Sequence, residues 1–183
     1  MTSGTWELCN RWSCTPEWSW FGGTSTGTAA VWNKWRLCGD VTLDYYVGPR
    51  MVDRGPGRPK EVCQDFNAVL CGDGRDVSRG YSFIIGQGDE GAVAKLLRNG
   101  QVVATNDAFR WYTAAHNRWF NVRIEKRDAT LTLRVEEQPI LSWTDPDPLQ
   151  EGYAGIWTRD NGILLPRVTI YTQGVTGEVL SLQ

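Results

Sequence analysis

The sequence predicts an all-β protein, folded as a two-sheet antiparallel sandwich of the jelly-roll type. Apolar and polar residues alternate with a period of two in many short runs, which is typical of half-buried strands. Turn-forming residues, among them 20 glycines, separate these runs. Helical periodicity never extends beyond two turns. With 183 residues, the chain is expected to form a single domain that spans residues 1–183.

The alternation is clearest in the run 41–47. Valine, leucine and tyrosine occupy its odd positions, and Thr42 and Asp44 lie between them. This pattern predicts a strand with one buried face. By the same reasoning, further strands are expected at 6–12, 17–21, 29–35, 66–71, 80–86, 92–98, 101–105, 119–126, 129–136, 139–143, 153–158 and 167–171.

Two short reversals connect neighbouring strands. The pair Asn99-Gly100 separates two apolar runs, and both residues tolerate a positive φ, so a tight hairpin is predicted there. The pair Arg127-Asp128 marks a second reversal. About a dozen short strands joined in this way fit two packed sheets.

Charge and hydropathy exclude several classes of protein. The net charge of −2 provides no electrostatic footprint for nucleic acid. The longest apolar stretches are too short to span a bilayer, so no membrane partner is expected. Residues 1–6 lack the charged and apolar regions of a signal peptide, which indicates either an intracellular protein or one whose leader has been removed.

The cysteines leave two alternatives open. The chain has five of them and one histidine, His116, with no C-x-x-C pair, which disfavours a structural zinc site. Cys9 with Cys14, or Cys63 with Cys71, could form a bridge if their strands lie side by side. Alternatively, all five are buried thiols that pack as small apolar side chains.

The order of motifs in the second half of the chain resembles a known superfamily. The relevant segments are Gly80–Gly86, Arg98–Gly100, His116–Glu125, Thr130–Val135, Gly152–Thr158 and Val168–Tyr171. Over residues 38–171 they resemble the concanavalin A-like lectin/glucanase superfamily, in particular its bacterial laminin-G-like and 3-keto-disaccharide-hydrolase-like members. There, a W-x-x-V-x-I strand and a later G-x-x-G-I/L strand recur in this order.

The resemblance implies a jelly roll with one concave sheet, across which glycans commonly lie. By analogy, 66–71, 80–86, 91–98 and 153–158 should form the concave sheet, and 119–126, 130–136 and 167–172 the convex one. Alternation along 153–158 then directs Ile156 inward and Trp157 outward into the groove. An extracellular or periplasmic location is favoured by the same analogy.

Carbohydrate is the partner that the aromatic residues favour. Ten tryptophans are present, and an indole face suits the weakly positive face of a sugar ring. Trp157 and Trp111 are the predicted platforms, whereas Trp32 lies within a strand and is expected in the core. The polar residues predicted to bind sugar hydroxyls are Asn67, Lys95 and Arg98.

Two other functions remain open. Retaining glucanases of the superfamily carry an E-x-D-x-E strand, which this sequence lacks. A glycoside hydrolase, or a hydrolase that processes 3-keto-glycosides, would therefore need another carboxylate pair, with Asp65 and Asp89 as candidates in the same groove. The third hypothesis is a structural or adhesive module that binds another protein.

No cofactor is required by any of these functions. Calcium is common in the superfamily and needs carboxylate and carbonyl ligands, for which Asp40 and Asp145 are the candidates. The sequence alone leaves open which sugar is bound and which oligomeric state the protein adopts.

Overall fold

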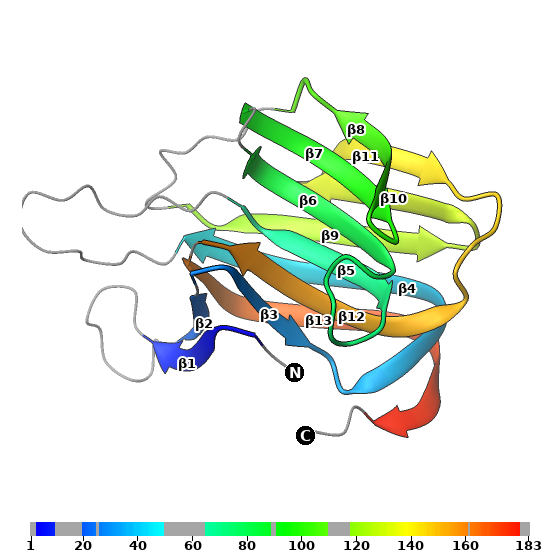
Figure 1. Cartoon of the computed structure of the whole chain (residues 1–183), viewed down its shortest axis with the longest axis horizontal. Coiled ribbons are helices and arrows are strands. Elements are labelled where there is room, and N and C mark those ends of the chain that lie inside the picture. Colours follow the sequence, from blue (N-terminus) through cyan, green and yellow to red (C-terminus); the bar gives the residue numbers. More distant parts are fainter. Residues whose placement is uncertain are drawn as a thin grey trace, which may run out of the picture.

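The computed structural model describes residues 3–9, 20–24, 26–49, 65–88, 91–109, 118–160 and 162–179. Within these ranges the regular structure consists of 13 strands without a helix (Figure 1). They are β1 (Thr5–Cys9), β2 (Trp20–Thr24), β3 (Thr28–Trp32), β4 (Trp35–Pro49), β5 (Asn67–Gly72), β6 (Tyr81–Gly88), β7 (Gly91–Arg98), β8 (Gln101–Asn106), β9 (Phe120–Arg127), β10 (Thr130–Val135), β11 (Gln138–Thr144), β12 (Glu151–Arg159) and β13 (Gly162–Val179).

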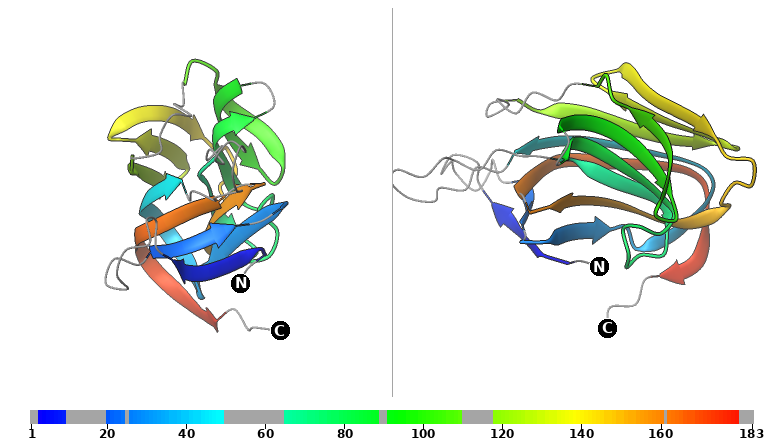
Figure 2. Two further views of the ribbon diagram at one scale, coloured as in Figure 1. Left: turned by 90° about the vertical axis from the view of Figure 1, so that its left-hand side faces the viewer. Right: turned by 45° about the horizontal axis from the view of Figure 1, so that its top comes forward.

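The strands form two antiparallel layers (Figure 2). Sheet A has the strand order β3-β12-β5-β6-β7-β8. Sheet B has the order β1-β2-β13-β4-β9-β10-β11. At its first residues β12 also pairs with β4, where Glu151 lies opposite Cys38 and Gly152 opposite Leu37, so the two sheets are joined at that end.

This architecture confirms the predicted all-β sandwich. The four segments expected on the concave sheet all lie in sheet A, and the three expected on the convex sheet all lie in sheet B. Each predicted run overlaps an observed strand, because period-two alternation requires one buried face per strand.

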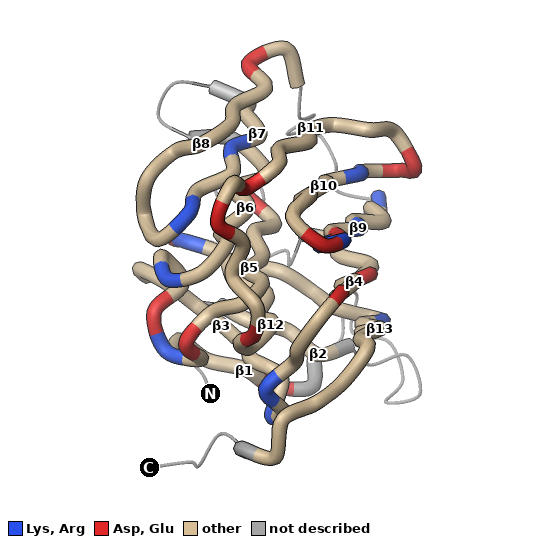
Figure 3. Tube along the Cα trace, turned by 90° about the vertical axis from the view of Figure 1, so that its right-hand side faces the viewer, with Lys and Arg blue, Asp and Glu red and all other residues tan. Residues whose placement is uncertain are grey.

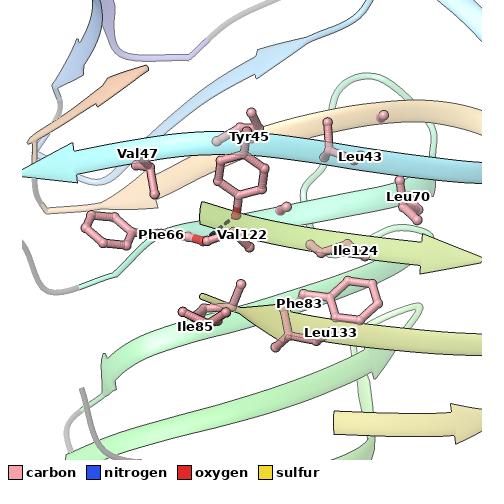
Figure 4. Close-up of a cluster of buried hydrophobic side chains, with 14 of the residues drawn as sticks. Leu43, Tyr45, Val47, Phe66, Leu70, Phe83, Ile85, Val122, Ile124 and Leu133 are labelled. Carbon is pink, nitrogen blue, oxygen red and sulfur yellow. Dashed lines mark hydrogen bonds between the residues drawn. The ribbon is translucent and has the colours of Figure 1, made fainter. Parts of the chain in front are cut away.

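The main core lies between the sheets (Figure 4). Leu43, Tyr45 and Val47 of β4 are at most 1% exposed and face side chains from sheet A. The Tyr45 hydroxyl donates to the Phe66 carbonyl oxygen at 2.8 Å. Burial, followed by the nearby charge of Asp65, raises the pKa of Tyr45 well above its usual value, so this phenol remains protonated as a donor.

The predicted turns are present. Asn99 and Gly100 both have positive φ, 48° and 83°, between β7 and β8. Asp128, with φ 47°, turns the chain from β9 into β10. The Asn99 side chain adds a contact that the sequence does not reveal, because its Oδ1 accepts a hydrogen bond from Gly80 N at 2.9 Å.

The proposed Cys63–Cys71 bridge is wrong. Cys71 has a free thiol, as does Cys38. The Cys71 Sγ lies 3.9 Å from the Leu149 carbonyl oxygen, and burial raises the pKa of this thiol to about 11. The alternative pair, Cys9 and Cys14, has side chains outside the described part of the structure.

The described residues contain no helix with the length and apolarity that a membrane crossing needs.

Candidate functional site

Three of the predicted sugar-binding residues lie in one row across sheet A. Trp157 of β12 is opposite Asn67 of β5. The next residue of β5, Ala68, pairs with Phe83, which brings Asn67 beside Ile84 of β6. Ile84 in turn is opposite Lys95 of β7. Because alternate residues of a strand share a face, this row lies on the side of sheet A away from the main core, here called the outer face.

A second row runs parallel to the first. Trp32 of β3 is opposite Gly155, which pairs with Val69 of β5. A Cβ atom on Gly155 would lie only 2.8 Å from the Trp32 ring, and one on Gly72 only 2.6 Å from it. The two glycines therefore leave the space in which the indole of Trp32 packs.

Trp32, Tyr153 and Trp157 form a cluster with Ala30 and Val69 that is separate from the main core, here called the outer aromatic cluster. Trp32 is buried, as the sequence predicts, but it packs in this second cluster and not between the two sheets. Tyr153 and Trp32 were not predicted as site residues, although the spacing Tyr153-Gly155-Trp157 already places one aromatic pair on a common face.

Trp157 lies on the outer face, as the alternation predicts, but it is only 3% exposed. Val77 and Ile84 pack against the cluster, and the Arg159 guanidinium lies 5.8 Å from the centroid of the Trp157 ring. The indole N–H groups of Trp157 and Trp32 are both buried, and neither has a hydrogen-bond acceptor among the residues that the structure describes. A buried donor without an acceptor costs about 1–3 kcal/mol, so this cluster holds two unsatisfied donors.

Asn67 is fully buried at the centre of the first row. Its Nδ2 donates to Asp65 Oδ2 at 2.6 Å, and its Oδ1 accepts from Ile85 N at 2.9 Å. The amide is thus used to hold β5 against β6, and in this arrangement it offers no surface to a ligand.

The Asp65 carboxylate is also occupied by protein donors. Besides Asn67, its Oδ1 accepts from the Thr158 hydroxyl and from Arg159 N at 3.2 Å. The other candidate acid, Asp89, lies outside the described residues. Trp111, the second predicted platform, lies outside them as well. Within the described part of the chain, the Asp65 carboxylate therefore connects β5 to β12 through these hydrogen bonds.

Lys95 occupies the open part of the first row. Its side chain is partly buried between Ile84 on β6 and Thr105 on β8. Thr105 is exposed, so the row opens from the buried Trp157 toward the β7–β8 side of the sheet.

Arg98 and Asp145 were predicted to bind sugar and calcium, respectively, but the structure pairs them with each other. Arg98 Nε donates to Asp145 Oδ2 at 2.6 Å, and the Tyr81 hydroxyl donates to the same oxygen at 2.6 Å. Asp147 N donates to Asp145 Oδ1 at 2.9 Å. Both carboxylate oxygens are thereby taken by protein donors, and Arg98 is held at the end of β7.

The hydrogen bonds around Asp145 shift the pKa values of two groups, Asp145 itself and Tyr81. Desolvation favours the neutral Asp145, but the hydrogen bonds from Tyr81, Asp147 N and Arg98 outweigh it and lower the pKa of Asp145 below its usual value. Desolvation and the hydrogen bond to Asp145 raise the pKa of Tyr81 well above its usual value. The cluster therefore keeps a charged carboxylate and a protonated phenol side by side.

Asp40, the other predicted calcium ligand, lies on β4 in sheet B. Its oxygens accept from Asp128 N at 2.7 Å and from Gln173 Nε2 at 3.0 Å. The described residues contain no group of three or more histidine, cysteine or acidic side chains that could hold a metal ion.

Basic and acidic residues both occur on β4 and β9 of sheet B (Figure 3). Their side chains form ion pairs on the outer face of this sheet, unlike the cations on the outer face of sheet A. Arg123 lies 3.9 Å from Asp44 and 3.7 Å from Glu125. Arg127 lies 3.4 Å from Glu125 and 3.9 Å from Asp40. These residues form a connected network of ion pairs.

The fold is shared with several solved carbohydrate-binding domains. The carbohydrate-binding module CBM66 from Bacillus subtilis aligns with a TM-score of 0.68 at 17% identity, over 94% of each chain. The exoplasmic/lumenal domain of VIP36, solved with calcium and mannose, aligns with a TM-score of 0.65 at 10% identity, over 96% of this chain and 84% of that one. The Emp47p carbohydrate recognition domain gives 0.63 at 12% identity, over 94% and 87%. Neither a protein-family model nor a curated protein matches the sequence.

Proposed function

We propose that this chain is a carbohydrate-binding jelly-roll domain that engages an oligo- or polysaccharide on the outer face of sheet A. The observation that carries the proposal is the outer aromatic cluster, in which the indole N–H groups of Trp32 and Trp157 have no acceptor among the described residues. Because both groups are buried, a glycan reaches them only when the side chains that cover them move. Sugar hydroxyl and ring oxygens are acceptors of the kind that these donors lack, and indole faces suit sugar rings.

The similar folds support carbohydrate as the ligand class. CBM66 is named a carbohydrate-binding module and the Emp47p domain a carbohydrate recognition domain, and the VIP36 domain was solved with mannose bound. In the first row, the side chains change from aromatic at Trp157 to apolar at Ile84 and cationic at Lys95. An apolar surface with a few polar groups is typical of a small-molecule site.

Trp157→Phe tests the proposal because it removes the N–H group and keeps most of the ring. Losing one hydrogen bond to the glycan is expected to weaken binding about 10-fold, as measured by isothermal titration calorimetry on a glycan selected from an array. Trp143→Phe is the matched control, since Trp143 packs against Tyr81 in the main core with ring centroids 6.5 Å apart. This control is expected to keep the affinity of the original protein.

Unchanged affinity in Trp157→Phe, with the fold intact by circular dichroism, would remove the outer aromatic cluster from the site. The titrations are run with calcium and with a chelator. We expect equal affinity in both, because the carboxylates of Asp40 and Asp145 are already engaged by protein donors. Silence on a broad array would reject the carbohydrate proposal in favour of a protein partner.

A further inference from the structure

We infer that the bound glycan is anionic, and that Lys95 and Arg159 on the outer face of sheet A receive its acidic groups. The inference rests on the proposed function and adds the class of sugar: a chain that carries carboxylates, as uronic acids do, or sulfate esters. It follows from an imbalance of charge between the two sheets.

Lys95 is a cation without a counterion. Across the sheet its neighbours are Ile84 and Thr105, and on its own strand Val93 and Leu97 share its face. Its ammonium group makes no ion pair or hydrogen bond with any residue that the structure describes. Lys95 is partly exposed, so its ammonium group is open to a charge-assisted hydrogen bond with an anionic ligand.

Arg159 is the second cation on this face. It follows Trp157 by two residues on β12, so the two side chains share a face, and its guanidinium lies over the Trp157 ring. Its backbone N donates to Asp65, whereas its guanidinium has no carboxylate partner among the described residues. An arginine held on an aromatic ring keeps its planar donors free for a carboxylate or a sulfate.

The two cations lie at opposite ends of the first row, with Lys95 at one end and Arg159 over Trp157 at the other. Lys95 is on β7 and Trp157 on β12, with β5 and β6 between them. Three strand spacings of about 4.8 Å place these positions about 14 Å apart. An extended oligosaccharide with repeated acidic groups fits this separation better than a single sugar does.

Few acids on sheet A compete for these cations. In its described strands the one carboxylate side chain is Glu151, which pairs with Arg36 at 2.9 Å. Asp65, which precedes β5, is 9% exposed and already accepts several protein hydrogen bonds. In sheet B, by contrast, Arg123 and Arg127 each have carboxylate partners within 4 Å. Among the described residues, Lys95 and the Arg159 guanidinium on this face are therefore left without a carboxylate partner.

The test compares matched polymers by titration calorimetry near physiological salt. One pair is oligogalacturonate and its carboxyl-reduced counterpart, and the other is dextran sulfate and dextran. We expect at least about 10-fold tighter binding of one anionic polymer than of its neutral counterpart, because a charge-assisted hydrogen bond contributes more than a neutral one. The preferred pair identifies carboxylate or sulfate as the anion.

Three variants test the assignment to Lys95. Lys95→Gln is expected to reduce the anionic preference about 10-fold, whereas Lys95→Arg keeps the charge and should preserve it. Arg167→Gln is the matched control, because Arg167 is exposed on β13 of sheet B and also lacks a described carboxylate partner. Its affinity should not change if the site lies on sheet A.

Equal affinity for neutral and anionic polymers would overturn the inference, and so would a preference that survives in Lys95→Gln. If a neutral glycan binds and Trp157→Phe weakens it, the proposed function stands while the anionic assignment fails. If no polymer or array glycan binds, both fail. An equal loss in Lys95→Gln and Arg167→Gln would indicate only general attraction to polyanions, and it would also reject the site.

Discussion

Asp145 is a residue whose role depends on distant parts of the chain. Its carboxylate is 2% exposed and receives hydrogen bonds from Tyr81 and Arg98, which precede it by 64 and 47 residues. The Tyr81 hydroxyl in turn accepts from Leu149 N at 2.7 Å. One buried charge thus connects β6, β7 and the segment between β11 and β12.

Replacement of Asp145 by asparagine should lower the free energy of unfolding by about 2 kcal/mol at pH 7, because Arg98 loses its buried partner. The native pKa of Asp145 is below 3.8, its value in the unfolded chain. The stabilisation by the carboxylate is therefore complete above pH 4 and disappears as the pH falls through the native pKa. Urea unfolding of Asp145→Asn and of the original protein should differ at pH 7, and the difference should shrink as the pH falls through the native pKa of Asp145.

Asp147→Asn is the control for this measurement. The Asp147 side chain is 97% exposed and 3.5 Å from Arg98, so its removal should change the stability little at either pH. A difference between Asp145→Asn and the original protein that is as large at pH 2 as at pH 7 would show that packing, not charge, explains the loss.

The candidate site shows what a sequence reveals about single residues. Alternation predicts that Trp157 faces outward, and the strand registers place it in one row with Asn67 and Lys95. It does not reveal burial, because the side chains that cover Trp157 come from β3, β5 and β6 and from Val77. The pairing of Arg98 with Asp145 is not visible in the sequence for a similar reason, since the two residues lie far apart along the chain.

At the scale of elements, the β7–β8 hairpin depends on Asn99. This residue adopts φ 48°, and its side chain accepts from Gly80 N, while Asn99 N donates to the Gly80 carbonyl oxygen at 2.8 Å. Two strand connections, before β6 and after β7, are therefore tied by one residue.

Asn99→Ala is expected to destabilise the protein by about 1–2 kcal/mol, because alanine disfavours this backbone region and lacks the acceptor for Gly80 N. Asn99→Gly separates the two effects: it tolerates the backbone angle and loses only the side-chain bond, so its loss should be smaller. Chemical denaturation of the three proteins measures the order. If alanine and glycine destabilise equally, the positive φ contributes nothing.

Strand β13 is much longer than the strand that the sequence predicts at this position. The prediction covers residues 167–171, whereas the strand extends from Gly162 to Val179. Pro166, Gly174 and Gly177 indicate breaks in a sequence. In the structure β2 pairs with β13 only at residues 162–165, and the remainder pairs with β4 alone, so much of β13 is an edge where proline and glycine are tolerated.

At the scale of the molecule, both sheets contribute to one continuous core. Leu43 and Ile124 of sheet B and Phe83 and Ile156 of sheet A belong to the same buried cluster. Loss of either sheet would expose the apolar face of the other. This is why period-two alternation alone is enough to predict the sandwich, whereas the ligand site needs the registers between distant strands.

One cooperative unfolding transition is expected for this reason. In a urea titration, tryptophan fluorescence and far-ultraviolet circular dichroism should give the same midpoint. The fluorescence includes tryptophans from the outer aromatic cluster and the main core, and the dichroism reports both sheets. Two separated midpoints would contradict a single cooperative unit and would indicate that one layer melts before the other.

The short pairing of β12 with β4 has a consequence for internal motion. Because Glu151 and Gly152 of β12 pair with Cys38 and Leu37 of β4, backbone hydrogen bonds connect the two layers at this end. Sliding of one layer over the other is therefore most restricted beside residues 37–38, because backbone hydrogen bonds must break there before the layers can move, whereas the main core joins the layers through side chains.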